Sequence, residues 1–238
     1  MMDDLLGEPP KKAKDIPHHV GHRDRLRERF AKSGADALQD YEILELILFT
    51  AIPRRDVKPL AKALLVQFST LPQMMAASVP ELMQVKGLSE NTALHLKAIT
   101  ALSHRAMRQE ISQRPLLNSW MRLMDYCFAT MAHEKREHFR IFFLNKKNEL
   151  IADEIQGSGT VDHTPAYPRE IMRRALELGA TALILVHNHP SGDPKPSQAD
   201  IKMTKQVIEA GRPFDIMIHD HIIISKNGYK SLKNEGLI

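Results

Sequence analysis

The spacing of apolar residues divides the chain into two regions. Between Asp40 and Glu110, apolar side chains recur three and four positions apart, as they do on one face of a helix. After Glu137 they form short continuous or alternating runs, which are typical of strands. Residues 1–20 show neither pattern. We therefore predict a disordered lead-in over 1–20, a helical half and then a half in which helices and strands alternate.

The helical half, residues 21–115, has the spacing of several short helices. A first helix is expected over 22–34, where Gly34 would end it. At Ser78 the order Ser-Val-Pro-Glu places a glutamate three residues after a serine, which is the pattern of a capping box. The breaks between helices are expected at Pro53, Pro59 and Pro72.

The second half, residues 116–238, begins with an amphipathic helix and continues with two strands that meet at a polar turn, 145–148. A helix that starts at Pro168 and ends at Gly179 follows, and then a strand, a helix and a last strand. The expected bounds are 119–134 for the first helix, 138–156 for the two strands, and 168–179, 181–186, 198–210 and 214–225 for the later elements.

The composition restricts the chemistry more than the charge does. The 238 residues carry a formal charge of +4, with basic and acidic residues interleaved, so charge alone does not indicate a nucleic-acid partner. Cys127 is the single cysteine, which limits a metal site to histidine and carboxylate ligands. There is no apolar run of about 18 residues and no secretory leader pattern, so we expect a cytoplasmic protein without membrane contact.

The stretch LILVHNHPSGDPKPSQADI, residues 183–201, contains the strongest chemical pattern. Because side chains alternate along a strand, His187 and His189 would lie on the same face at its end. Asp200 would lie in the first turn of the next helix, where the helix dipole favours a carboxylate. Two imidazoles and one carboxylate form a ligand set of catalytic zinc sites. There are two alternatives without a metal. The histidines could simply lie where the strand reaches solvent, and Ser197 and Asp200 could simply form a capping box.

Together these residues form the pattern HxHPx6SxxD, which resembles the JAMM motif of the MPN-type metallopeptidases. The surrounding residues 168–201 resemble the RadC family, and the likeness extends over nearly the whole chain. It implies an α+β protein in which a helical domain precedes an α/β/α domain with a mixed sheet. It also implies one Zn2+ per chain, held by His187, His189 and Asp200, and hydrolysis of a peptide or isopeptide-like amide bond in an unknown peptide or protein substrate.

The residues alone leave the general base open among several carboxylates. In the JAMM family the acid lies where a helix passes into the first core strand, which implies Glu137, with Glu154 as the second choice. The same resemblance gives Ser197 a hydrogen bond to the oxyanion, in competition with simple N-capping. Asp220 and His221 could orient a ligand imidazole, although we favour a structural role for both. The candidate carboxylates are Glu137, Glu149, Asp153, Glu154 and Glu170.

Residues 79–99 resemble a helix-hairpin-helix with its turn at 85–89. Such turns hold DNA phosphates without reading the base sequence, and here Lys86, Gly87 and Ser89 would make the contact. A plain helical hairpin is the alternative, because the turn has only one glycine. The second functional hypothesis is therefore a DNA-binding repair or recombination accessory protein with a non-hydrolytic or regulatory zinc domain. A zinc nucleobase deaminase is disfavoured, because its HxE pattern and cysteine pair are missing.

Overall fold

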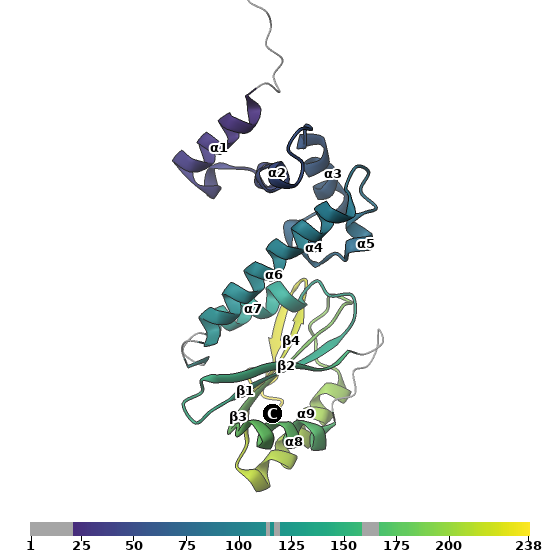
Figure 1. Cartoon of the computed structure of the whole chain (residues 1–238). Coiled ribbons are helices and arrows are strands. Elements are labelled where there is room, and N and C mark those ends of the chain that lie inside the picture. Colours follow the sequence, from purple (N-terminus) through teal and green to yellow (C-terminus); the bar gives the residue numbers. More distant parts are fainter. Residues whose placement is uncertain (1–20, 113–114, 117–119, 159–166) are drawn as a thin grey trace, which may run out of the picture.

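The computed structural model describes residues 21–112, 115–116, 120–158 and 167–238. Two units follow one another along the chain, a helical unit and a sheet unit, and the long helix α6 joins them (Figure 1). The lead-in predicted over 1–20 lies outside the described residues, as does part of the segment around the expected boundary at 115–116. Among the described residues, no helix has the length and apolar character needed to span a membrane.

The helical unit packs its short helices around one apolar core. Leu44, Leu48 and Leu64 are among the side chains completely buried there. Ser78 and Glu81 form the predicted capping box. The elements are α1 (His22–Ser33), η1 (Ala35–Ala37), α2 (Asp40–Ala51), α3 (Lys58–Phe68), α4 (Leu71–Ala76), α5 (Val79–Leu82) and α6 (Glu90–Ser112).

Two of the predicted proline breaks need correction. Pro59 is the second residue of α3, and Pro72 is the second residue of α4. The backbone N–H groups in the first turn of a helix have no carbonyl acceptor within that helix, so a proline there loses no hydrogen bond. These prolines therefore begin helices, whereas Pro53 lies between α2 and α3 as expected.

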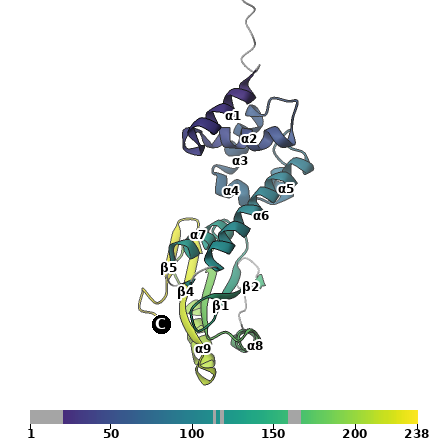
Figure 2. The same ribbon diagram turned by 60° about the vertical axis from the view of Figure 1, so that its left-hand side comes forward.

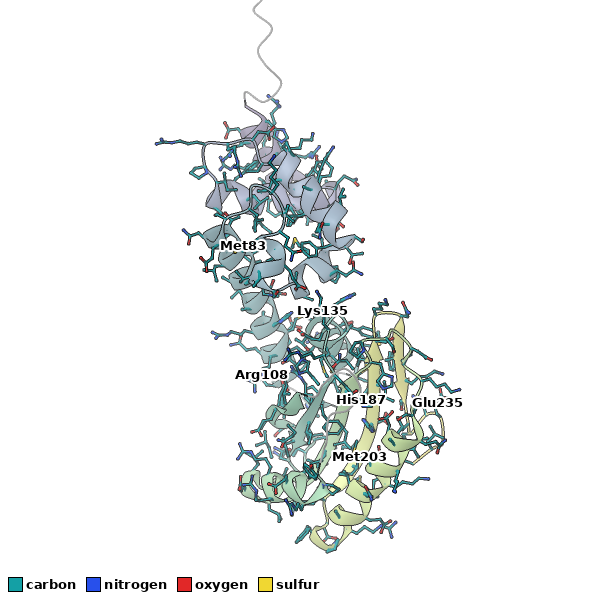
Figure 3. The ribbon with its side chains drawn as sticks, turned by 90° about the vertical axis from the view of Figure 1, so that its right-hand side faces the viewer. Met83, Arg108, Lys135, His187, Met203 and Glu235 are labelled. Carbon is teal, nitrogen blue, oxygen red and sulfur yellow. The ribbon has the colours of Figure 1, made fainter. Side chains whose placement is uncertain are left out.

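Helix α6 is longer than the helices around it and belongs to both units. Its 23 residues span about 35 Å at 1.5 Å per residue. It contacts α2, α4 and α5 in the helical unit, and α7 and β2 in the sheet unit (Figure 2). Lys135, which Figure 3 shows near the junction of the units, forms an ion pair with Glu81 of α5.

The sheet unit contains five strands in the order β2-β1-β3-β4-β5. β3 and β4 are parallel and the other neighbours are antiparallel, so the sheet is mixed. The elements are α7 (Trp120–Met131), β1 (His138–Leu144), β2 (Leu150–Ser158), α8 (Pro168–Leu178), β3 (Ala182–Asn188), α9 (Gln198–Gly211), η3 (Arg212–Phe214), β4 (Met217–Ser225) and β5 (Gly228–Ser231).

Helices cover both faces of this sheet, which gives the expected α/β/α arrangement (Figure 1). Phe142, Ile184 and Ile222 pack on the side of α7. Ile141 and Leu185 point the other way and pack against α8 and α9. β3 is therefore buried on both faces along its whole length. The fold class predicted from the sequence, α+β with a helical first half and a mixed sheet, is confirmed.

The last strands differ from the prediction. β4 begins at Met217 and not at residue 214, because Arg212–Phe214 form a 3-10 turn and Asp215 has a left-handed backbone with φ of 54°. The four-residue strand β5 was not predicted, since its sequence GYKS has no apolar alternation. It adds to the sheet by pairing with the end of β4.

Candidate metal centre

The two histidines of the HxHP stretch lie together at the end of β3, where Figure 3 labels His187. Their Nε2 atoms are 2.9 Å apart. Asp200, in the first turn of α9, places Oδ1 3.5 Å from Nε2 of His187 and Oδ2 3.7 Å from Nε2 of His189. Among the described residues, these three side chains form a group in which one ligand atom from each lies within 4.8 Å of the others. The structure thus brings the three predicted ligands into one cluster.

These separations fit a small divalent cation. Four ligand atoms that surround zinc tetrahedrally at about 2.1 Å lie about 3.4 Å from one another. In the cluster the two Nε2 atoms are closer to each other than this value, and each lies slightly farther than this value from a different oxygen of Asp200. Two imidazole nitrogens and one carboxylate oxygen leave the fourth position of a tetrahedron to solvent or substrate, as catalytic zinc sites require. The donor set and its spacing therefore fit zinc.

The second ring nitrogen of each histidine is also engaged. Nδ1 of His189 lies 2.8 Å from the carbonyl oxygen of Asp193. A carbonyl only accepts hydrogen bonds, so this Nδ1 carries a proton and neutral His189 has its lone pair on Nε2. Nδ1 of His187 lies 2.8 Å from Nε2 of His221. Such contacts orient a ligand ring towards a metal.

Burial and charge set the protonation of the cluster. Burial lowers the pKa of His187 to about 4. The nearby carboxylate of Asp200 raises the pKa of His189, against the effect of burial. Burial would raise the pKa of Asp200, but the nearby His189 and His187 and the hydrogen bonds from Ser197 hold it well below its usual range. The carboxylate is thus ionised and His187 is neutral at neutral pH, the states that metal ligation needs.

Ser197 forms the N-cap of α9. Its Oγ accepts a hydrogen bond from the backbone N–H of Asp200 at 3.1 Å, and its own N–H and hydroxyl donate to Oδ2 of Asp200, each at 2.7 Å. The capping box that the sequence suggested is therefore present. Since the hydroxyl proton points at Asp200, the oxyanion role of Ser197 stays a prediction, and it would require the hydroxyl to turn.

Glu137 directly precedes β1 and lies near the cluster. Its negative charge is the smallest of several causes that raise the pKa of His189, after the nearby Asp200. Glu137 thus lies at the position expected for the acid, at the entry to the first core strand. Its catalytic role stays a prediction.

Asn188, between the two ligand histidines, fixes the segment that carries Glu137. It points to the opposite face of β3 and is completely buried. Its Oδ1 accepts from the backbone N–H of His138 at 2.8 Å, and its Nδ2 donates to the carbonyl oxygens of Arg136 at 3.0 Å and Glu134 at 3.4 Å. This role of Asn188 was not predicted, although a polar residue inside a buried strand is a signal for it.

Comparison with known families agrees with this geometry. Residues 117–237 match the model of the RadC-like JAB domain, and residues 18–94 match the UPF0758 N-terminal model. The chain belongs to the RadC-like JAB domain family. The helical unit of this RadC-like protein thus has a family model of its own, distinct from that of the sheet unit.

Glu154, the second choice for the base in this RadC-like protein, is held in an ion pair. Nε of Arg174 lies 3.0 Å from its Oε2, and Nη2 of Arg174 lies 2.6 Å from its Oε1. The hydrogen bonds from Arg174 lower the pKa of Glu154. A carboxylate committed to a guanidinium is a weak proton acceptor, so its environment favours a structural role.

Asp220 and His221, which the sequence pattern did not separate, make different contacts. Asp220 has the expected structural role, because its carboxylate binds the hydroxyl of Ser231 at 2.5 Å and the backbone N–H of Lys233 at 3.2 Å. His221, in contrast, contacts the predicted ligand His187. The parallel register of β3 and β4 explains this contact, because His221 lies opposite Leu185, on the face that His187 shares.

The turn of the suspected helix-hairpin-helix lies between α5 and α6. Lys86, Gly87 and Ser89 are all exposed, and Gly87 has a φ of 92° that favours glycine. Oγ of Ser89 accepts a hydrogen bond from the backbone N–H of Thr92 at 3.3 Å and so caps α6. α5 has only four residues. DNA binding by this turn stays a prediction.

Proposed function

We propose that this RadC-like protein is a zinc-dependent hydrolase that cleaves a peptide or isopeptide-like amide bond and binds one zinc ion per chain. The observation that carries the proposal is the convergence of His187, His189 and Asp200, with Glu137 interacting with the same cluster. Membership of the JAB domain family supports it, because this family includes metallohydrolases.

Each side chain has a separate task in the proposed reaction. A bound zinc ion would act as a Lewis acid and bring the pKa of a coordinated water to about 7. Glu137 would accept the proton of the attacking water and return it to the leaving amine. Asp200, ionised, would offset part of the metal charge, and Ser197 would turn its hydroxyl from Asp200 to the oxyanion.

Two glutamine variants of similar shape test the assignment. Glu137→Gln removes the base, so we expect turnover to fall about 10²- to 10⁴-fold while one zinc per chain is retained. Glu154→Gln is the matched control and should keep turnover. Activity would be measured on quenched peptides and on peptides joined through a lysine ε-amide, and zinc by elemental analysis. A wild-type protein that binds no zinc, or a Glu137→Gln variant with full turnover, would overturn the proposal.

The alternative is a DNA-binding accessory protein whose zinc domain has a non-hydrolytic or regulatory role. The exposed Lys86 beside the left-handed Gly87, immediately before α6, favours it. The affinity for duplex DNA should then fall steeply with salt, and Lys86→Ala should reduce the slope of log affinity against log salt by about 1. Binding that is insensitive to salt and to Lys86→Ala would exclude this contact. The two activities reside in different units of the chain and are compatible.

A further inference from the structure

A chain of three hydrogen bonds leads from Asp200 back to the ligand His187 through residues that the proposed reaction does not use. Oγ1 of Thr204 lies 2.6 Å from the backbone carbonyl oxygen of Asp200. The same Oγ1 lies 2.5 Å from Nδ1 of His221. Nε2 of His221 lies 2.8 Å from Nδ1 of His187. The chain closes a loop that contains two of the three predicted ligands.

The direction of every proton in this chain follows from its first member. The carbonyl oxygen of Asp200 can only accept, so Thr204 must direct its single hydroxyl proton there. Oγ1 of Thr204 is then an acceptor for His221, which therefore carries a proton on Nδ1. The opposite direction would place two acceptor atoms 2.6 Å apart with no proton between them.

The same reasoning continues to the ligand. A neutral His221 with its proton on Nδ1 has a lone pair on Nε2, so it accepts from Nδ1–H of His187. Neutral His187 then has its lone pair on Nε2, the atom that points at His189 and Asp200. The other tautomer of His187 would point an N–H at the cluster and could not bind a cation there.

The surroundings of the chain keep water from altering it. Thr204 and His221 are completely buried, and His187 is 1% exposed. The ring of Phe139 stacks on His187 with 6.2 Å between ring centres and meets the edge of His221 at 5.6 Å. A solvent molecule therefore has no access from which to supply an alternative donor or acceptor.

We propose that Thr204 and His221 are positioning residues that fix the tautomer and the ring orientation of His187 and so prepare the cation site. The inference rests on the proposed zinc site and extends it to two residues outside the HxHP…SxxD pattern. The inference also connects two of the predicted ligands, because the backbone carbonyl of Asp200 determines the tautomer of His187 through Thr204 and His221. Loss of such contacts around a metal ligand typically weakens metal affinity 10- to 100-fold.

Thr204→Val tests the first link, because valine has nearly the same shape and lacks the hydroxyl. Zinc affinity, measured by competition with a chromogenic chelator, should fall 10- to 100-fold. Thr204→Ser, which retains the hydroxyl, should remain close to wild type. Thr100→Val is the matched control, since Thr100 is a buried threonine of α6 whose hydroxyl likewise donates to the carbonyl four residues earlier, and it should bind zinc like wild type.

A second measurement needs neither zinc nor turnover. Nitrogen-15 NMR of the metal-free full chain reports which nitrogen of each imidazole carries the proton, and His187 and His221 should both be protonated on Nδ1 in the wild type. Thr204→Val should remove this preference in His221. Unchanged zinc affinity in Thr204→Val, or an Nε2–H tautomer of His187 in the wild type, would refute the inference. A wild type that shows the expected tautomers but binds no zinc would instead refute the proposed function.

Discussion

Two buried polar clusters lie on opposite faces of the same sheet, and they differ in how their charge is balanced. On the α7 side, Nη1 of Arg140 lies 3.0 Å from both carboxylate oxygens of Asp153, and the hydroxyl of Tyr126 donates to this carboxylate at 2.6 Å. Burial raises the pKa of Tyr126 to about 12, so the phenol stays protonated. This cluster contains its own cation and anion.

On the α9 side, the metal-centre residues all present acceptor atoms to one point. His187, His189 and Asp200 direct two imidazole nitrogens and a carboxylate inward. The guanidinium of Arg140 thus has no counterpart in this trio. The first cluster can therefore stabilise the fold by itself, whereas the second, in the proposed function, takes its cation from outside the chain. Substitutions in the first cluster should therefore lower the free energy of unfolding without changing zinc affinity, whereas substitutions in the second should mainly remove the effect of zinc.

The largest expected effect on stability is at Asp153, whose side chain is 3% exposed. Asp153→Ala would leave the buried guanidinium of Arg140 without its partner, which typically costs about 3–5 kcal/mol. The free energy of unfolding should fall by this amount in urea titrations with a chelator present. The zinc affinity of the folded fraction should stay unchanged. A loss below about 1 kcal/mol would mean that the pair contributes little to the fold.

Zinc itself should distinguish the second cluster. At a free concentration of 100 times its Kd, a ligand that binds only the folded state raises the free energy of unfolding by about 2.7 kcal/mol. Wild-type protein should show this gain, and Asp200→Ala should lose it. In zinc-free protein the same substitution should cost only about 1 kcal/mol, because it removes the acidic member of the α9 capping box. A zinc-dependent gain that survives in Asp200→Ala would contradict the ligand assignment.

The features that the sequence predicted depend on neighbours along the chain. Strand alternation places His187 and His189 on one face, and the Ser197 capping pattern places Asp200 in the first turn of α9. The turn at 145–148 was also predictable, because polar residues separate two strand-like runs. Local periodicity and capping chemistry are enough for such features.

The remaining features depend on contacts between distant segments. Arg174 binds Glu154 from a position 20 residues away in the sequence. His221 reaches His187 only because β4 lies parallel to β3. The strand β5 has no apolar alternation and exists because the end of β4 offers it a pairing edge. Periodicity contains no information about such partners.

A substitution at Asn188 should distinguish the contribution of Glu137, at the entry of β1, from that of the three predicted metal ligands. Asn188→Ala removes three partly buried hydrogen bonds to the segment 134–138 and leaves their backbone groups without this partner, at a cost of about 1–3 kcal/mol. Because this segment carries Glu137, turnover should fall while zinc affinity stays near wild type.

Asn145→Ala is a matched control, since Asn145 also binds two backbone N–H groups, in the β1–β2 turn. It should lose stability but keep turnover per folded molecule. Equal turnover in the two variants would dissociate Asn188 from the placement of the base.

The smallest expected effect concerns the ion pair between Glu154 and Arg174, which resembles the Arg140–Asp153 pair in chemistry but is partly exposed to solvent. Exposed pairs contribute about 0.2–1 kcal/mol, so Glu154→Gln should cost no more than this at neutral pH.

The contribution of the Glu154–Arg174 ion pair to stability depends on pH, because the pKa of Glu154 is lowered in the folded state. A carboxyl group with a lowered folded pKa contributes stability above its ordinary value of 4.5, and this contribution is lost as the pH falls through the folded pKa. The difference in unfolding free energy between wild type and Glu154→Gln should therefore be present at pH 7 and shrink steadily below about pH 4.5. Urea titrations of both proteins across this range would measure it. A difference that grows towards acid would mean that Arg174 does not stabilise the ionised form, and Glu154 would again compete with Glu137 for the role of base.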